Sequence, residues 1–200
     1  MPCGARLEVG WIPVRRTVAR DGEVAADDHI DIAIKLLPIL EQPAQDDIVR
    51  DELERRGWRR QPDGSLTKPF GEANATLAPG TTTIRVAVAQ RQSVRATASS
   101  DGVARAEDVA AQDAIGARAG AAADAELARV KQHAVAELVQ RNIASIQRVE
   151  SAVRAEVAGV ANAATKRSLL QRAAEIGAIE SSRESRAADG SLELTITVKT

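Results

Sequence analysis

A single apolar stripe in a long proline-free segment constrains this chain more than any other feature of its sequence. All seven prolines lie before residue 80, and residues 103–178 hold 24 of the 39 alanines. Alanine loses no side-chain entropy in a helix, whereas proline breaks the helical hydrogen-bond ladder. The apolar positions recur every three or four residues, about 3.6 on average. They are Val139, Ile143, Ile146, Val149, Val153, Val157, Val160 and Ala164. The sequence therefore predicts a long helix with one apolar face.

This predicted helix needs a surface that covers its stripe. An uninterrupted helix over residues 122–176 would be roughly 80 Å long, more than a compact domain can cover. We expect either that the chain folds back as a helical hairpin, with glycines as the weak points, or that another chain supplies the partner. Exposed apolar helix faces favour association. The candidate interaction residues are Val139, Ile143, Ile146, Val149, Val153, Val157 and Val160. The glycines are Gly116, Gly120 and Gly159.

The first forty residues show the alternation that is typical of strands. Apolar residues alternate with others up to Trp11, which predicts a half-buried strand over residues 5–20 that bends at Pro13. Residues 29–40 fit both the alternation of a strand and one face of a helix. Pro38 would disturb a helix more than a strand, so we favour a strand there.

One helix and several short strands are predicted next. Pro43 at the start and Gly57 at the end indicate a helix over residues 43–56. The turn residues Pro62-Asp63-Gly64 separate two β segments and predict a hairpin. Two further strands are expected over residues 73–77 and 81–99. The side chains expected to start the long helix are Ser99, Ser100, Asp101 and Gly102.

The last residues predict a β-hairpin. Residues 179–185 read as a strand, Asp189-Gly190 as a turn, and the final apolar residues alternate strictly with polar ones: Leu192, Leu194, Ile196 and Val198. The predicted fold class is α+β, with an antiparallel sheet, one packed helix and a long Ala-rich helical hairpin or coiled-coil insertion. Its expected parts are an N-terminal α+β part (1–101), a helical arm (102–177) and a C-terminal hairpin (178–200) that completes the sheet.

Two segments of the chain share the order helix, Gly, strand, DGSL, strand. They are residues 54–68 and 174–198. A Gly after a helix and an Asp-Gly turn are common in α+β proteins, and this alone can explain the shared order. The alternative is that the segments are two related αββ units that pair into one antiparallel sheet. Residues 165–198, and more faintly 43–70, resemble small proteins of cyanobacteria, of algal plastids and of bacterial gene clusters that encode FtsH-like or MoxR-like AAA+ ATPases. The resemblance implies an accessory role beside an ATPase and carries no catalytic signature.

The charged and reactive residues do not point to a common enzyme class. The net charge is −1, so no global field draws the chain to nucleic acid or acidic lipid. No run is apolar enough to cross a membrane, and a secretory leader is not evident, so we expect a cytoplasmic protein. Cys3 has no positioned base, and His133 reads as a surface residue. The acidic cluster reads as a solvated loop rather than a metal site: Asp21, Glu23, Asp27, Asp28, His29 and Asp31.

We therefore expect a protein that is not an enzyme and that has no cofactor and no metal. It would act in protein–protein interaction or as a structural subunit, as a homo-oligomer formed through its helices or as an adaptor of an AAA+ ATPase. The alternative is nucleic-acid binding by arginines of the predicted sheet, namely Arg85, Arg91 and Arg95. A second arginine group is expected to be a paired helix face: Arg55, Arg56, Arg59 and Arg60. The scarcity of aromatic residues argues against nucleic acid.

Overall fold

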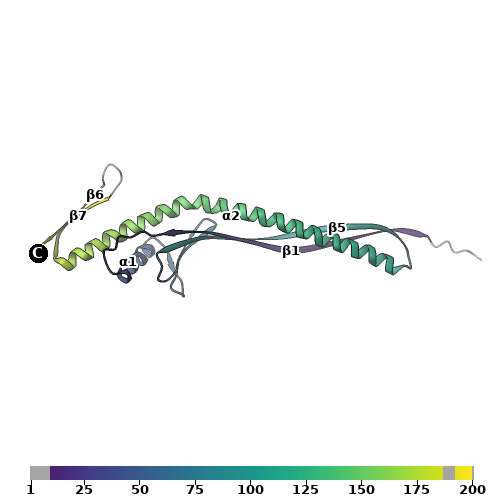
Figure 1. The fold of residues 1–200 in the computed structure, drawn as a ribbon, viewed down its shortest axis with the longest axis horizontal. Helices are drawn as coiled ribbons and strands as arrows, with labels where there is room; N and C mark the ends of the chain where they lie inside the picture. Colours follow the sequence, from purple (N-terminus) through teal and green to yellow (C-terminus); the bar gives the residue numbers. More distant parts are fainter. Residues whose placement is uncertain (1–9, 187–191, 200) are drawn as a thin grey trace, which may run out of the picture. The chain divides into compact units, whose positions relative to one another are not determined.

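The structure, a computed structural model, describes residues 10–186 and 192–199 and has the predicted α+β class. Its elements follow the order β1 (Trp11–Ala33), α1 (Gln42–Arg55), β2 (Arg59–Arg60), β3 (Leu66–Phe70), β4 (Ala73–Leu77), β5 (Thr83–Arg105), α2 (Val109–Ile176), β6 (Ala178–Arg186) and β7 (Leu192–Lys199). Figure 1 labels both helices and the strands β1, β5, β6 and β7. Five strands form one sheet in the order β1-β5-β4-β3-β2. Strand β2 pairs with β3, β3 with β4, and β4 with β5, each antiparallel as expected.

The C-terminal strands pair with each other in a sheet of their own. The expectation that they complete the main sheet is therefore wrong, and the alternative of two αββ units that pair into one sheet is excluded as well. The two strands themselves are confirmed, and Leu194, Ile196 and Val198 are half-buried on one face of β7 while the residues between them are exposed. The predicted turn at Asp189-Gly190 lies outside the described residues.

The contacts divide the chain into two units, each built from two sequence segments. Unit 1 combines Met1–Asp27 with Ala89–Asn142, and unit 2 combines Asp28–Val88 with Ile143–Thr200. Three elements, β1, β5 and α2, each contribute residues to both units. The division into parts at residues 101/102 and 177/178 stays a prediction.

In unit 1, α2 packs on one face of the two long strands. Even-numbered strand residues face the helix, and the buried cluster consists of Val24, Ala26, Val94, Ala134 and Leu138. Small strand residues let the helix approach closely: a Cβ added to Gly102 would lie 2.6 Å from Ile115 Cδ1. Pro13 does not interrupt β1, because this strand lies at the edge of the sheet, where a missing N–H is tolerated.

The long helix begins later than the sequence suggested. The residues expected to start it, at 99–102, belong to β5, which continues to Arg105. Asp108 caps the helix instead, since its Oδ1 accepts a hydrogen bond from the backbone N–H of Ala111 at 3.0 Å. The sequence does not predict this N-cap, because the residues of β5 that face α2 before it are small and give little apolar signal.

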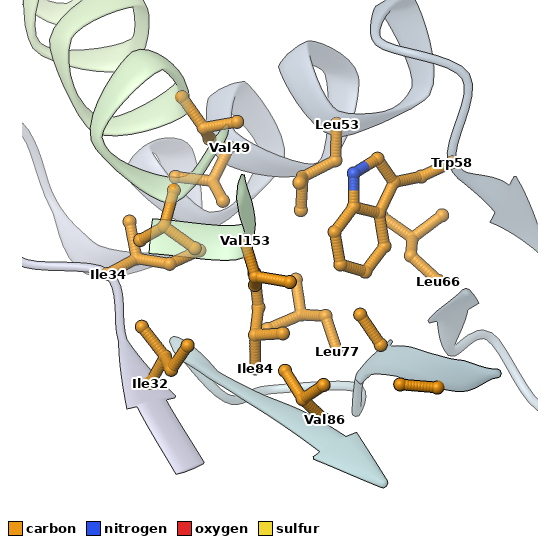
Figure 2. Close-up of a cluster of buried hydrophobic side chains, with 14 of the residues drawn as sticks. Ile32, Ile34, Val49, Leu53, Trp58, Leu66, Leu77, Ile84, Val86 and Val153 are labelled. Carbon is orange, nitrogen blue, oxygen red and sulfur yellow. The ribbon is translucent and has the colours of Figure 1, made fainter. Parts of the chain in front are cut away.

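In unit 2, α1 and α2 cover one face of the sheet and enclose the larger core. Figure 2 shows side chains from both helices and four strands pointing toward one another. The predicted helix at 43–56 is confirmed, and Gly57 (φ 87°) ends it as predicted. The N–H groups of Gly57 and Trp58 bond to the carbonyls of Glu54 and Leu53, which is a Schellman motif. The predicted strand over 29–40 is confirmed only as far as Ala33.

Helix α2 is continuous from Val109 to Ile176, through Gly116, Gly120 and Gly159. The helical-hairpin alternative is therefore wrong. The chain's own sheet covers the apolar stripe in unit 2, since Val153, Val157 and Val160 share one buried cluster with Ile84 and Val86 of β5. Periodicity identifies the apolar face of a helix but not the surface that covers it.

Candidate functional site

The residues predicted to form the interaction surface lie mainly inside the molecule. Ile146, Val153, Val157 and Val160 belong to the core of unit 2, and Val153 points toward Ile84 in Figure 2. Val149 packs against the same core and Val139 against the core of unit 1, while Ile143 is half-buried. These side chains already have partners within the chain. Contact with another protein through the stripe stays a prediction.

Two exposed apolar residues lie instead in unit 1, where β1 starts and β5 ends. Trp11 is 62% exposed and Val103 63%. The guanidinium of Arg105 lies over the Trp11 ring at 5.3 Å. We call Trp11, Val103 and Arg105, which lie on the sheet face away from α2, the Trp11 patch. Trp11 was predicted to lie on a half-buried strand face, and its exposure shows that alternation alone did not identify the covered side.

The same face of β1 and β5, away from α2, carries cross-strand ion pairs. In unit 1, Arg15 lies 3.6 Å from Asp101, and Arg95 lies 3.6 Å from Asp21. In unit 2, Arg85 Nε lies 3.2 Å from Asp31. Two of the arginines considered for nucleic-acid binding, Arg85 and Arg95, therefore have carboxylate partners. All of these groups are well exposed, so each pair contributes little to stability.

The acidic cluster expected to be a solvated loop lies instead in strand β1, so that expectation is wrong: Asp21, Glu23, Asp27, Asp28, His29 and Asp31. Their side chains are exposed or half-buried along the strand and do not converge. Within residues 10–186 and 192–199, no three His, Cys, Asp or Glu side chains gather in a group that could hold a metal ion. His133 is exposed on α2, as predicted, and lies 3.3 Å from Glu137. Cys3 lies outside the described residues. An open hollow of about 520 Å³ in unit 2 includes Arg172 and Glu175, which pair with each other at 2.7 Å.

A half-buried polar network joins α1, β3 and α2 in unit 2. Lys68 Nζ lies 2.8 Å from Glu156 Oε1 and donates to the Arg56 carbonyl at 2.8 Å. Arg56 Nε donates to Glu52 at 2.9 Å, and Arg56 Nη2 donates to the Gly159 carbonyl at 3.2 Å. The expectation that the arginines near the end of α1 form a paired helix face is confirmed for Arg56. The network connects the end of α1, strand β3 and helix α2, so its role is structural.

Among the residues that the structure describes, the one clearly shifted pKa belongs to a carboxyl group in a turn, Asp63. Both the Ser65 hydroxyl and the Ser65 backbone N–H donate to Asp63 Oδ1, at 2.7 and 2.9 Å. These hydrogen bonds stabilise the carboxylate and lower the pKa of Asp63 below its ordinary value. The turn between β2 and β3 is the hairpin that the sequence predicted.

Comparisons with known proteins give a family but no individual relatives. No curated protein matches the chain, and no solved structure matches it. In the part of the chain that the structure describes, no helix has both the length and the apolar character of a membrane span. A family model, FtsH ternary system domain X5, matches residues 11–200. This agrees with the resemblance to proteins of FtsH-like gene clusters, and the chain belongs to the FtsH ternary system domain X5 family.

Proposed function

We propose that this chain is a non-enzymatic accessory subunit that binds the FtsH-type AAA+ protease of its own system through the Trp11 patch. Membership of an FtsH ternary system family supports an association with such a protease. The observation that carries the proposal is the exposed Trp11 with Arg105 stacked on its ring. Trp and Arg are the residue types that contribute most often to binding hot spots.

The physical reason for choosing this patch is the cost of leaving it in water. Trp11 is one of only two tryptophans in the chain, and the other, Trp58, is 3% exposed in the core of unit 2. Val103 is as exposed as Trp11, so two large apolar side chains on the same face of the sheet contact solvent. Burial of these side chains by a partner would remove apolar surface from water, which favours association.

The proposal places the contact away from the apolar stripe of α2. Oligomerisation through the stripe would require Val153 and Val160, both fully buried, to leave the core of unit 2. The Trp11 patch needs no such rearrangement. Nucleic-acid binding has less support, because Arg85 and Arg95 are paired with carboxylates on the same sheet face.

The test is direct binding between the purified chain and the purified FtsH-type protease of its own system, measured by isothermal titration calorimetry. We expect Trp11→Ala to weaken binding by about 30-fold or more, the size of a hot-spot effect. Val103→Asp should also weaken binding, because it places a charge in the apolar patch.

Leu37→Asp is the matched control, since Leu37 is also 63% exposed but lies in unit 2. Its binding should stay within about threefold of wild type. Absence of binding by the wild-type chain would refute the association with the protease. Equal effects of Val103→Asp and Leu37→Asp would refute the assignment to the Trp11 patch.

A further inference from the structure

The C-terminal hairpin leaves the outer edge of strand β7 without a neighbouring strand among the described residues. β6 and β7 form a two-stranded sheet, so among the described residues one edge of β7 has no strand beside it (Figure 1). A two-stranded hairpin is marginally stable in water by itself. The segment at α1, β2 and β3, which has the same order of helix, Gly, strand, turn and strand, does not stop at two strands, because β3 pairs with β4 on its other edge. The corresponding edge of β7 is open.

The two edges of this hairpin differ in the way that distinguishes protected edges from binding edges. β6 contains Glu180, Arg183 and Glu184, together with a register shift between Ile179 and Ser181. Charged residues and bulges are the features that prevent strands from pairing with other chains. The centre of β7, Leu194–Val198, contains no charge, no proline and no glycine, and its β-branched residues favour strands.

The sequence of β7 is complementary to itself when two copies run antiparallel around Ile196. In that register, Glu193 lies opposite Lys199 of the second copy, and Leu194 lies opposite Val198. Thr195 lies opposite Thr197, and Ile196 lies opposite its own equivalent. Opposite charges, Thr–Thr pairs and aliphatic pairs are all favourable across strands.

The register also matches the two faces of the strand. Leu194, Ile196 and Val198 are half-buried, and Glu193, Thr195, Thr197 and Lys199 are exposed. Residues that lie opposite each other in an antiparallel pair project from the same face. The pairing therefore places the apolar residues of both strands on one face of the combined sheet and the polar and charged residues on the other. By symmetry, the ion pair between Glu193 and Lys199 forms twice.

We propose that two copies of the chain associate through their β7 edges, in antiparallel register about Ile196, to form a four-stranded sheet with the order β6-β7-β7-β6. This assembly does not depend on the FtsH-type protease and goes beyond the function proposed above. The occupant of the β7 edge is a second copy, because the charges at the two ends of β7 complement each other only when the strands are antiparallel.

The experiment is a charge exchange in the full-length protein, with the dimer dissociation constant measured by sedimentation velocity over a dilution series. In the proposed dimer, Glu193→Lys places a lysine opposite Lys199 of the other copy at two symmetric positions. Lys199→Glu places a glutamate opposite Glu193 of the other copy at the same two positions. Each single variant should weaken the dimer by about tenfold or more. The double variant restores opposite charges and should return the constant to within about threefold of wild type.

Glu180→Lys is the matched control, because it makes the same charge change on β6, away from the β7 edge. It should leave the dissociation constant unchanged, and circular dichroism should show the same helix and strand content for every variant. Glu193 accepts a hydrogen bond from Ser185 within its own hairpin, so this check matters for Glu193→Lys. A monomer up to about 100 μM would overturn the proposal, as affinities of specific dimers are tighter than this. A dimer that is insensitive to both single charge changes would equally overturn it.

Discussion

The effect of Gly159→Ala on stability should change sign depending on whether Arg56 is present: destabilising in wild type and stabilising in an Arg56→Ala background. Gly159 lies inside α2, where alanine would normally stabilise the helix by about 1 kcal/mol. A Cβ at this position would lie 2.7 Å from Nη1 of Arg56 and 3.2 Å from its Cζ. The guanidinium would therefore have to leave the position in which it donates to the Gly159 carbonyl.

The cost of moving Arg56 exceeds the gain in helix propensity. A hydrogen bond from a charged donor contributes about 1.5–3 kcal/mol, and the Arg56 side chain is 32% exposed, which favours the lower end of that range. We expect Gly159→Ala to destabilise wild type by about 0.5–1 kcal/mol after the propensity gain is subtracted. In an Arg56→Ala background the same change should stabilise the protein by about 1 kcal/mol, so the coupling energy is about 2 kcal/mol.

Urea denaturation of the four proteins of this double-mutant cycle measures the effect, with the emission maximum of the buried Trp58 as the probe for unit 2. Gly116→Ala is the matched control, because it lies in the same helix and an added Cβ meets no atom within 4 Å. It should stabilise α2 by about 1 kcal/mol with or without Arg56, as followed by circular dichroism. If Gly159→Ala shifts the midpoint equally in both backgrounds, the packing of Arg56 on Gly159 does not limit this position.

Three further predictions concern buried or hydrogen-bonded groups. Val153→Asp places a charge at a fully buried position and should destabilise unit 2 by about 4 kcal/mol or more, enough to unfold it. Unfolding would appear as a red shift of Trp58 emission, and a native emission spectrum would contradict the core assignment. Asn142→Ala removes the donor that bonds the Ala26 carbonyl at 2.9 Å and should cost about 2 kcal/mol in urea denaturation, whereas a neutral effect would show that this bond is not needed. The lowered pKa of Asp63 stabilises the native state above the unfolded pKa, and this contribution is lost as the pH falls through the folded pKa. Asp63→Asn should therefore flatten the fall in stability below about pH 4, and an unchanged slope in urea midpoints would refute the turn's contribution.

The periodicity of apolar residues predicted the buried positions correctly wherever large apolar side chains lie on the covered face of a strand. Ile84, Val86 and Val88 alternate with polar or small residues, and all three are buried as the alternation predicts. The end of the same strand was not predicted because the residues that face α2 there, Ser100, Gly102 and Ala104, are small and give no apolar signal. Ala104 is fully buried against α2 without providing an apolar signal. Burial of alanine depends on the surface opposite, which a single segment does not contain.

The candidate site was predictable only in part for a related reason. The stripe of α2 was identified as a surface in need of a partner, and Val153 and Val160 do have one, but it is the chain's own sheet. The exposed Trp11 was not identified, because the alternation around it predicts which residues share a face and not which face is covered. The resemblance of the C-terminal segment led to the family, whereas the composition did not.

The discontinuity of the two units restricts how the chain can be shortened or divided. A cut after Asn142 would sever α2 and would deprive unit 2 of Val153, Val157 and Val160, which line its core. A cut before Asp28 would remove Val24 and Ala26 from the cluster of unit 1. Neither unit is encoded by one contiguous stretch of sequence, so neither can be cloned as a simple fragment, and exchange between related genes by a single crossover would separate residues that pack together. Natural variation of this chain is therefore expected to preserve β1, β5 and α2 as a set and to place insertions in the short turns of unit 2.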